Sequence, residues 1–141
     1  MINELSVLVV EDDDVASESI TRSLKKVSPN INLVYAEHGK VAIEILKNEH
    51  PSRFLTTPYV VLLDLNMPVM NGFEFLEYVR EDPSLQDTIV FILTTSNDDN
   101  DRTRAYDNNV AGYMVKSAVG PQFAKLAALM DAYRNAVEPN R

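Results

Sequence analysis

The chain has no cysteine among its 141 residues. A disulfide framework, a thiolate metal site and a cysteine nucleophile are therefore excluded, and the composition is compatible with a reducing cytosol. Glycine is scarce as well, with four residues in the whole chain. The sequence accordingly contains neither a P-loop nor the glycine fingerprint of dinucleotide-binding proteins, both of which hold phosphate at a glycine-rich first turn.

The sequence also lacks long hydrophobic runs and has fewer basic than acidic residues. No stretch reaches about eighteen apolar residues, and the N-terminus shows no basic segment followed by an apolar one, so we expect no membrane association and a cytoplasmic location. The chain carries 13 basic and 21 acidic residues, for a formal net charge of −8. This charge repels nucleic-acid backbones and anionic membrane surfaces, so no nucleic-acid partner is expected.

Length and hydrophobic content fit one ordinary domain. With 45% hydrophobic residues, a chain of 141 residues buries a sizeable core without disulfides or metal staples. We expect a single domain over residues 1–141, with a folded core at about 4–137 and a short frayed tail behind it. We expect no second, output domain.

Apolar runs and helical periodicities take turns along the chain. Runs rich in valine, leucine and isoleucine indicate strands buried on both faces, and apolar residues at helical spacing, such as Ala16, Ile20 and Leu24, indicate helices. We expect Asp14 to cap the first helix. The expected strands are 5–10, 31–36, 59–63, 88–93 and 112–115, and the expected helices are 16–27, 40–48, 73–80, 101–108 and 121–137. This alternation predicts an α/β fold with a doubly wound five-stranded parallel sheet, flavodoxin-like (βα)5, in the strand order 2-1-3-4-5.

Unusual polar residues stand at the carboxyl ends of four expected strands. Glu11 and Asp12 follow the first strand, Asp64 the third, Thr94 the fourth and Lys116 the fifth. In an open parallel sheet these ends meet along one edge, where functional groups gather. Three carboxylates would repel one another there without a cation. Oxygen donors with no histidine or cysteine nearby favour Mg²⁺, or Mn²⁺, over zinc.

The same set of residues suits phosphoryl chemistry. Lys116 offers a positive charge and Thr94 a hydroxyl, which together with a metal ion would stabilise the oxygens of a phosphoryl group in transfer. Asp64 is then the natural nucleophile. Each residue alone has a plainer interpretation, since an acid after a strand is usually a helix cap or a solvated turn residue, and that interpretation suffices for Asp13 and Asp14. The prediction depends on the combined positions.

Four motifs follow one another along the chain. They are Val7-Leu8-Val9-Val10-Glu11-Asp12, Asp64-Leu65-Asn66-Met67-Pro68-Val69-Met70-Asn71-Gly72, Leu93-Thr94-Thr95-Ser96 and Gly112-Tyr113-Met114-Val115-Lys116. In this order and spacing they resemble the receiver domains of bacterial two-component response regulators. The resemblance spans essentially the whole chain and implies a stand-alone, single-domain receiver that signals when phosphorylated.

The resemblance implies a role for each matching residue at the strand ends. Asp64 would be the phosphoacceptor, and Lys116 would contact the phosphoryl group. Asp12 would bind Mg²⁺ directly, Glu11 largely through water, and Asn66 through its main-chain carbonyl. Asp64 would complete this set of metal ligands.

Thr94 and Tyr113 match the residues that transmit the switch in such domains. By the resemblance, the Thr94 hydroxyl moves toward the phosphoryl group and the Tyr113 ring rotates inward in the active state. The chain departs from the family pattern after Lys116, where receivers usually carry proline with a cis bond and this chain has Ser117. Because the cis form costs a non-proline residue about 2.5–4 kcal/mol, we expect a trans bond between Lys116 and Ser117.

The resemblance also implies partners. The phosphoryl donor would be a cognate sensor histidine kinase or a phosphotransfer protein. The long connection 50–58 and the ending 131–134 resemble those of receivers that accompany phytochrome-type kinases. Output would pass through protein contacts, including those of a homodimer formed through helix 101–108, strand 112–115 and helix 121–137. Such a domain is not an enzyme, because it promotes only its own phosphorylation and dephosphorylation.

Two other functions remain open from the sequence. A haloacid-dehalogenase-like phosphatase also phosphorylates an aspartate at a strand end, but it needs a second aspartate two residues on, where this chain has Asn66. A receiver-like module that docks without phosphorylation would have no use for the complete set of acids, Thr94 and Lys116. We therefore favour the phosphorylation switch.

Overall fold

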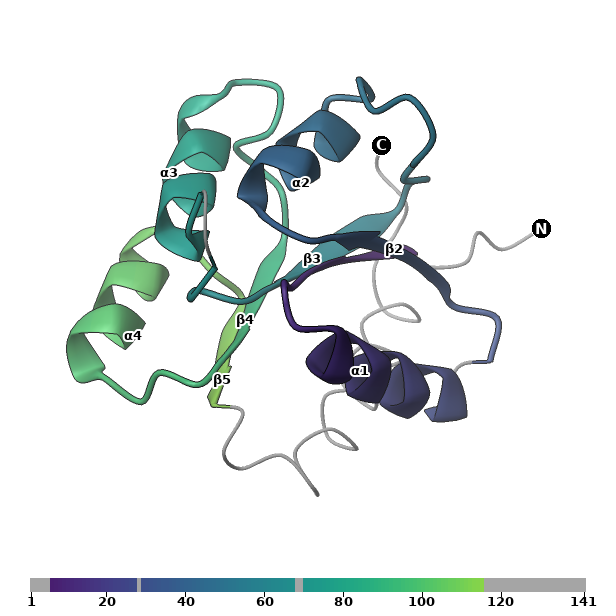
Figure 1. Cartoon of the computed structure of the whole chain (residues 1–141). Helices are drawn as coiled ribbons and strands as arrows, with labels where there is room; N and C mark the ends of the chain where they lie inside the picture. The colour runs from purple at the N-terminus through teal and green to yellow at the C-terminus, as the bar shows by residue number, and fades with distance from the viewer. Residues whose placement is uncertain (1–5, 28, 68–69, 116–141) are drawn as a thin grey trace.

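A computed structural model of the chain describes residues 6–27, 29–67 and 70–115. Strands and helices alternate through these ranges (Figure 1). The strands are β1 (Ser6–Val10), β2 (Asn32–Ala36), β3 (Tyr59–Leu63), β4 (Val90–Thr94) and β5 (Gly112–Val115), and the helices are α1 (Asp14–Val27), α2 (Gly39–Leu46), α3 (Gly72–Glu81) and α4 (Asp99–Asp107). None of the described helices is long and apolar enough to cross a membrane. The helix predicted at 121–137 lies outside the described residues.

The five strands form one parallel sheet in the order β2-β1-β3-β4-β5. β1 pairs with β2 on one side and β3 on the other, so that Val10 stands opposite both Ala36 and Leu63. The predicted doubly wound, flavodoxin-like topology is therefore confirmed. The direction of winding reverses between β1 and β3, and in such sheets the crevice for functional groups lies beyond the carboxyl ends of these two strands.

Successive strand residues point into two separate cores. Leu8 of β1 packs into a cluster with residues of α2, α3 and α4, whereas its neighbour Val9 packs into a cluster with Ile20 and Leu24 of α1. In Figure 1, α1 covers one side of the sheet, and α2 and α3 cover the other. Because both faces are covered, nearly every position of the inner strands β1, β3 and β4 is buried and favours an apolar residue, which explains their apolar runs in the sequence.

Helix α4 is attached differently from α3. Of its nine residues only Ala105 is buried, whereas α3 buries five residues, among them Phe75, Leu76 and Val79. The free energy of packing is roughly proportional to the apolar area removed from water. The position of α4 therefore depends mainly on polar contacts.

Aspartates begin two of the helices two residues earlier than predicted. Asp14 is the first residue of α1, and Asp13 caps that helix, because its Oδ1 accepts a hydrogen bond of 2.9 Å from the N–H of Val15. The prediction that Asp14 is the cap is wrong. In α4 the first residue is Asp99, because the carboxylate of Asp98 accepts from two N–H groups of the first turn. Both stretches are rich in aspartate, and composition alone does not decide which aspartate is the cap.

The fourth strand lies slightly later than predicted. The N–H of Thr88 donates to the carbonyl of Leu85 in a turn, and β4 starts at Val90. Thr94, expected just after the strand, is its last residue. The β-branched Thr88 favoured a strand, but the turn and its contacts with Arg80 determine its conformation.

Arg80, near the end of α3, connects the two loops that precede β4 and β5, at the edge of the sheet where these strands begin. Its guanidinium donates to the carbonyls of Gln86, Thr88, Asn108 and Asn109 at 2.8, 2.7, 2.6 and 3.2 Å. The first two precede β4, and the other two lie between α4 and β5. Partial burial lowers the pKa of this guanidinium from its ordinary value. The side chain thus fastens the α4–β5 connection to α3.

Arg80→Ala is expected to lower the free energy of unfolding by about 2–3 kcal/mol, because it leaves several carbonyls without a charged donor. Arg80→Lys should recover only part of the loss, since an ammonium group lacks the planar fork of donors. Urea denaturation followed by circular dichroism measures both values. Arg22→Ala is the control, because Arg22 is exposed and, among residues 6–27, 29–67 and 70–115, forms an ion pair with Glu18 alone. Equal urea midpoints for Arg80→Ala and Arg22→Ala would contradict the structural role of Arg80.

Candidate functional site

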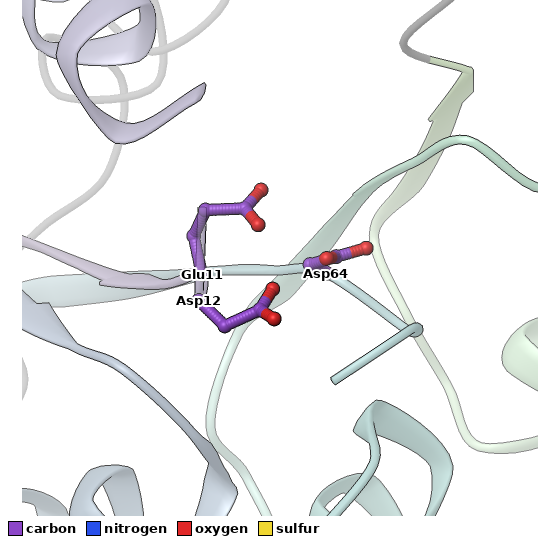
Figure 2. Close-up of side chains that lie close together, drawn as sticks. All are labelled: Glu11, Asp12 and Asp64. Carbon is purple, nitrogen blue, oxygen red and sulfur yellow. The ribbon is translucent and has the colours of Figure 1, made fainter. Parts of the chain in front are cut away.

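Three carboxylates meet at the carboxyl ends of β1 and β3. Glu11 and Asp12 follow β1, and Asp64 follows β3. The parallel pairing continues past the strands, since the N–H of Asp64 donates to the carbonyl of Val10 at 3.0 Å. One carboxylate oxygen from each of the three residues lies within 4.8 Å of the other two (Figure 2). The acidic residues singled out in the sequence therefore assemble at one edge of the sheet.

The three side chains differ in exposure and in hydrogen bonding. Glu11 and Asp64 keep 6% and 5% of their accessible surface, whereas Asp12 is exposed. The Oε2 atom of Glu11 accepts a hydrogen bond of 3.2 Å from the N–H of Asp13. The Oδ1 atom of Asp64 accepts one of 3.2 Å from the N–H of Asn66. Backbone amides thus hold both buried carboxylates in place.

The chemistry of this group fits a hard divalent cation. All three members offer carboxylate oxygens, the donors that Mg²⁺ and Mn²⁺ prefer. Carboxylates this close to one another, two of them buried, are unfavourable as anions unless a positive charge lies nearby. Because Asp12 is exposed, the group is accessible from solvent. The role of Asn66 as a main-chain ligand stays a prediction.

The start of α3 lies directly against the backbone of Asp64. The N–H of Gly72 donates to the carbonyl of Leu65 at 3.0 Å. A Cβ atom on Gly72 would lie 2.5 Å from the carbonyl oxygen of Asp64 and 2.6 Å from the Cα of Leu65. Asn71 and Glu74 form a capping box that begins α3 at this point. Only a residue without a side chain allows this close approach.

Thr94 has no exposed surface and lies at the end of β4. Its hydroxyl oxygen accepts from the N–H of Ser96 at 3.3 Å and from the Nδ2 of Asn66 at 3.5 Å. The same Asn66 nitrogen donates to the hydroxyl of Thr95 at 3.3 Å. The Asn66 side chain thus bridges the ends of β3 and β4. The sequence singled out only the main-chain carbonyl of Asn66 as a metal ligand, and no local signal places its amide beside Thr94 and Thr95, which lie 28 and 29 residues away.

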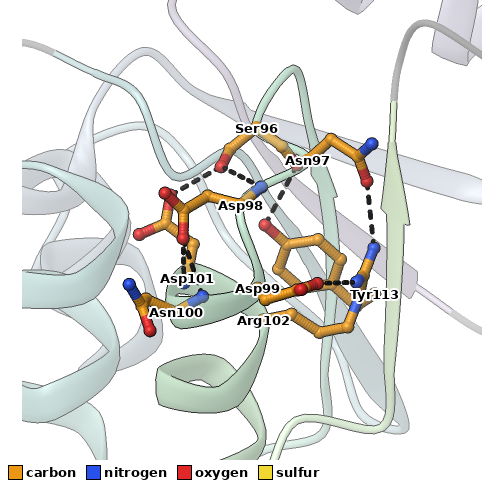
Figure 3. Close-up of polar contacts among 8 residues, drawn as sticks. All are labelled: Ser96, Asn97, Asp98, Asp99, Asn100, Asp101, Arg102 and Tyr113. Atoms are coloured by element: carbon orange, nitrogen blue, oxygen red, sulfur yellow. Dashed lines mark hydrogen bonds and ion pairs between the residues drawn. The ribbon is translucent and has the colours of Figure 1, made fainter.

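Tyr113 lies in β5 and contacts the loop that follows β4. Its half-buried ring packs against the core cluster of α2 and α3, and its hydroxyl donates to the carbonyl of Ser96 at 3.1 Å (Figure 3). Burial raises the pKa of the phenol from its ordinary value. Ser96 therefore contacts Thr94 through its N–H and Tyr113 through its carbonyl.

Part of the predicted site falls outside the described residues. Lys116 and Ser117 belong to that part, as does the range 121–137. The contact of Lys116 with a phosphoryl group, the trans bond that follows it and the contribution of 121–137 to a dimer stay predictions.

Residues 7–128 match the family model of the response regulator receiver domain. The chain belongs to this family. The matched range contains the strand ends that carry the three carboxylates, Thr94 and Tyr113. The resemblance stated from the four sequence motifs is thereby confirmed for the receiver domain.

Two curated relatives align with the chain over at least 70% of their own length. The receiver domain is 33% identical over 110 residues to the probable methanogenesis regulatory protein FilR2 of Methanothrix harundinacea, with 78% of this chain and 70% of the relative covered. It is 31% identical over 111 residues to the response regulator Rcp1 of Synechocystis, with 79% and 76% covered. The similarity thus extends well beyond the motifs.

Solved structures share the fold. The receiver domain resembles the crystal structure of the phosphorylated cyanobacterial phytochrome response regulator RcpA with a TM-score of 0.84 and 26% identity. The match covers 99% of this chain and 100% of the other. The sheet order of the described residues is therefore the one expected of a receiver fold.

Gly72→Ala is expected to lower the free energy of unfolding of the receiver domain by about 2–4 kcal/mol, because the new Cβ would overlap backbone atoms that cannot rotate away. The usual gain from replacing glycine in a helix is smaller than this. Urea denaturation measures the loss. Gly112→Ala is the matched control, since among the described residues its Cβ would meet two ring carbons of Phe91, at 3.2 and 3.6 Å. A Gly72→Ala variant as stable as the control would contradict the packing argument.

Proposed function

We propose that this receiver domain is a phosphorylation-dependent signalling switch that accepts a phosphoryl group on Asp64. The donor is a sensor histidine kinase or a phosphotransfer protein. The observation that carries the proposal is the convergence of Glu11, Asp12 and Asp64, whose carboxylate oxygens lie within 4.8 Å of one another at the strand ends. Bringing these carboxylates together costs folding free energy, and groups of this kind are concentrated at functional sites.

The transfer requires a nucleophile and positive charge near the phosphoryl oxygens. A carboxylate oxygen of Asp64 forms the bond to phosphorus while the bond from phosphorus to the donor's histidine nitrogen breaks, and the histidine leaves as the free base. Glu11, Asp12, Asp64 and the carbonyl of Asn66 would hold Mg²⁺, or Mn²⁺ in its place, which when bound supplies positive charge for the phosphoryl oxygens. Lys116 is proposed to add a second positive charge.

Relatives support both the chemistry and the type of partner. RcpA is described as a phosphorylated phytochrome response regulator, and a structure of Rcp1 is described as its Mn²⁺-bound form. By analogy with these proteins, the cognate kinase of the receiver domain is proposed to be of the phytochrome type. The cytoplasm is the compartment in which such kinases would meet it.

Output is proposed to pass through protein contacts rather than catalysis. The domain promotes only the gain and loss of its own phosphoryl group, and it therefore turns over no separate substrate. Thr94, Ser96 and Tyr113 form a hydrogen-bonded path from the end of β4 to β5. This path leads to the α4–β5 surface, which is proposed to bind a target or a second copy of the chain.

Mn²⁺ is expected to bind the wild-type domain, and Asp12→Asn is expected to weaken binding about tenfold, because it removes one of three anionic donors. The enhancement of water proton relaxation by bound Mn²⁺ measures the affinity. Asp107→Asn is the control, since Asp107 is exposed at the end of α4 and outside the acidic group. Equal affinities for Asp12→Asn and Asp107→Asn would argue against a metal site at Glu11, Asp12 and Asp64.

Incubation with Mg²⁺ and acetyl phosphate is expected to add the mass of one phosphoryl group to the wild-type protein and to Asp107→Asn, but not to Asp64→Asn. Intact-protein mass spectrometry detects the adduct, and omission of Mg²⁺ should abolish it. Beryllofluoride binding covers the case of a short-lived adduct. A wild-type protein that gains no phosphoryl group and binds no beryllofluoride would instead be a docking module that works without phosphorylation.

A further inference from the structure

Helix α4 begins with a network of polar contacts around Ser96. The Ser96 hydroxyl donates to the Oδ2 of Asp101 at 2.5 Å and accepts from the N–H of Asp98 at 3.3 Å. The carboxylate of Asp98 caps the helix. Figure 3 shows these residues together with Arg102 and Tyr113. The loop after β4 and the first turn of α4 are therefore tied to each other at Ser96.

Arg102 connects this network to the ring of Tyr113. Its guanidinium carbon lies 5.2 Å from the centroid of the ring, within the range of a cation–π interaction. Its Nη1 donates to the Oδ1 of Asp99 at 3.1 Å, and its Nη2 donates to the Oδ1 of Asn97 at 3.2 Å. The two acceptors orient the guanidinium plane, and the ring packs against it.

The Tyr113 ring is thus held at two points. Its hydroxyl donates to the Ser96 carbonyl, and its face contacts the Arg102 guanidinium. One contact comes from the β4–α4 loop and the other from α4 itself. Because α4 buries only Ala105, such side-chain contacts contribute much of what links the helix to β5.

We propose that Arg102 is a positioning residue that clamps the Tyr113 ring in the orientation that bonds to Ser96, before any phosphorylation takes place. This inference rests on the proposed function, in which the path from Thr94 through Ser96 to Tyr113 transmits the switch. The Arg102 contact restricts the Tyr113 ring to this orientation before phosphorylation takes place. Phosphorylation then has less conformational free energy to supply.

Loss of the clamp has a predictable size. Arg102 is partly exposed, and a cation–π contact at such a site changes a conformational equilibrium about two- to fivefold. Without Arg102, a second orientation of the Tyr113 ring should gain population by that factor. Any ligand that requires the Ser96-bonded orientation should bind more weakly by at most the same factor.

The experiment uses the full chain labelled with 3-fluorotyrosine and followed by ¹⁹F NMR. The chain has six tyrosines, and the Tyr113 signal is identified by its loss in Tyr113→Phe. Spectra of wild type, Arg102→Gln and Arg102→Lys are recorded without ligand and during a titration with beryllofluoride in Mg²⁺. Arg22→Gln is the matched control, because Arg22 is an exposed arginine of α1 whose ion pair, within the part of the chain that the structure describes, is with Glu18 of the same helix.

The proposal expects one dominant Tyr113 signal in wild type, in Arg22→Gln and in Arg102→Lys, which retains the positive charge. In Arg102→Gln a second signal should appear, with the ratio of the two orientations shifted about two- to fivefold, and the affinity for beryllofluoride should fall by no more than this factor. An unchanged Tyr113 signal in Arg102→Gln, or an Arg102→Lys variant indistinguishable from it, would overturn the clamp.

A second background separates positioning from helix stability. In a Tyr113→Leu protein, Arg102→Gln should leave the beryllofluoride affinity unchanged, because the ring through which Arg102 acts is gone. The same loss of affinity in both backgrounds would show that Arg102 acts through α4 alone and would overturn the proposal. If wild type binds no beryllofluoride, the proposed function fails, and the ligand-free Tyr113 spectra still decide the clamp.

Discussion

The parallel pairing of β1 with β3 is the constraint on which the candidate site depends. It places Glu11 beside Asp64 and removes both carboxylates almost entirely from solvent. Two buried acids next to a third are unfavourable by themselves. The two strands withstand this cost because residues 7–10 and 60–63 are at most 2% exposed, and burial of apolar surface stabilises the fold by roughly 25 cal/mol per Å². The packing of the two apolar cores therefore offsets the cost of placing these carboxylates together.

The sequence predicted the parts of the molecule that depend on strand periodicity. Unbroken apolar runs indicated strands covered on both faces, and a parallel sheet brings the ends of such strands to one edge. That geometry alone places Glu11, Asp12, Asp64 and Thr94 near one another before any side-chain contact is known. The sheet order predicted from this alternation is confirmed, and so is the family, which was indicated by the four sequence motifs.

Contacts between distant side chains were not predictable in this way. Nothing in the local sequence distinguishes Arg80, which reaches four carbonyls in two loops, from an exposed arginine such as Arg22. Position 72 requires glycine because the start of α3 packs against the backbone of Asp64 and Leu65, a contact that the local sequence does not reveal. The predicted cap Asp14 was off by one residue and the start of α4 by two, because each stretch holds several adjacent aspartates that can accept from the same backbone amides. These features depend on tertiary geometry, which a local pattern does not contain.

The helices on the sheet are held with unequal strength, and this inequality suits a switch. α1 is anchored by Ile20 and Leu24, whereas α4 buries only Ala105 and otherwise depends on contacts such as those of Arg102. Partly exposed charged contacts contribute at most about 1 kcal/mol each, so a shift of α4 costs little compared with a shift of α1. Coupling between two sites is reciprocal in free energy. Under the proposed function, a partner that binds the shifted α4 must therefore stabilise the phosphorylated state of Asp64 by the same factor by which phosphorylation strengthens its binding.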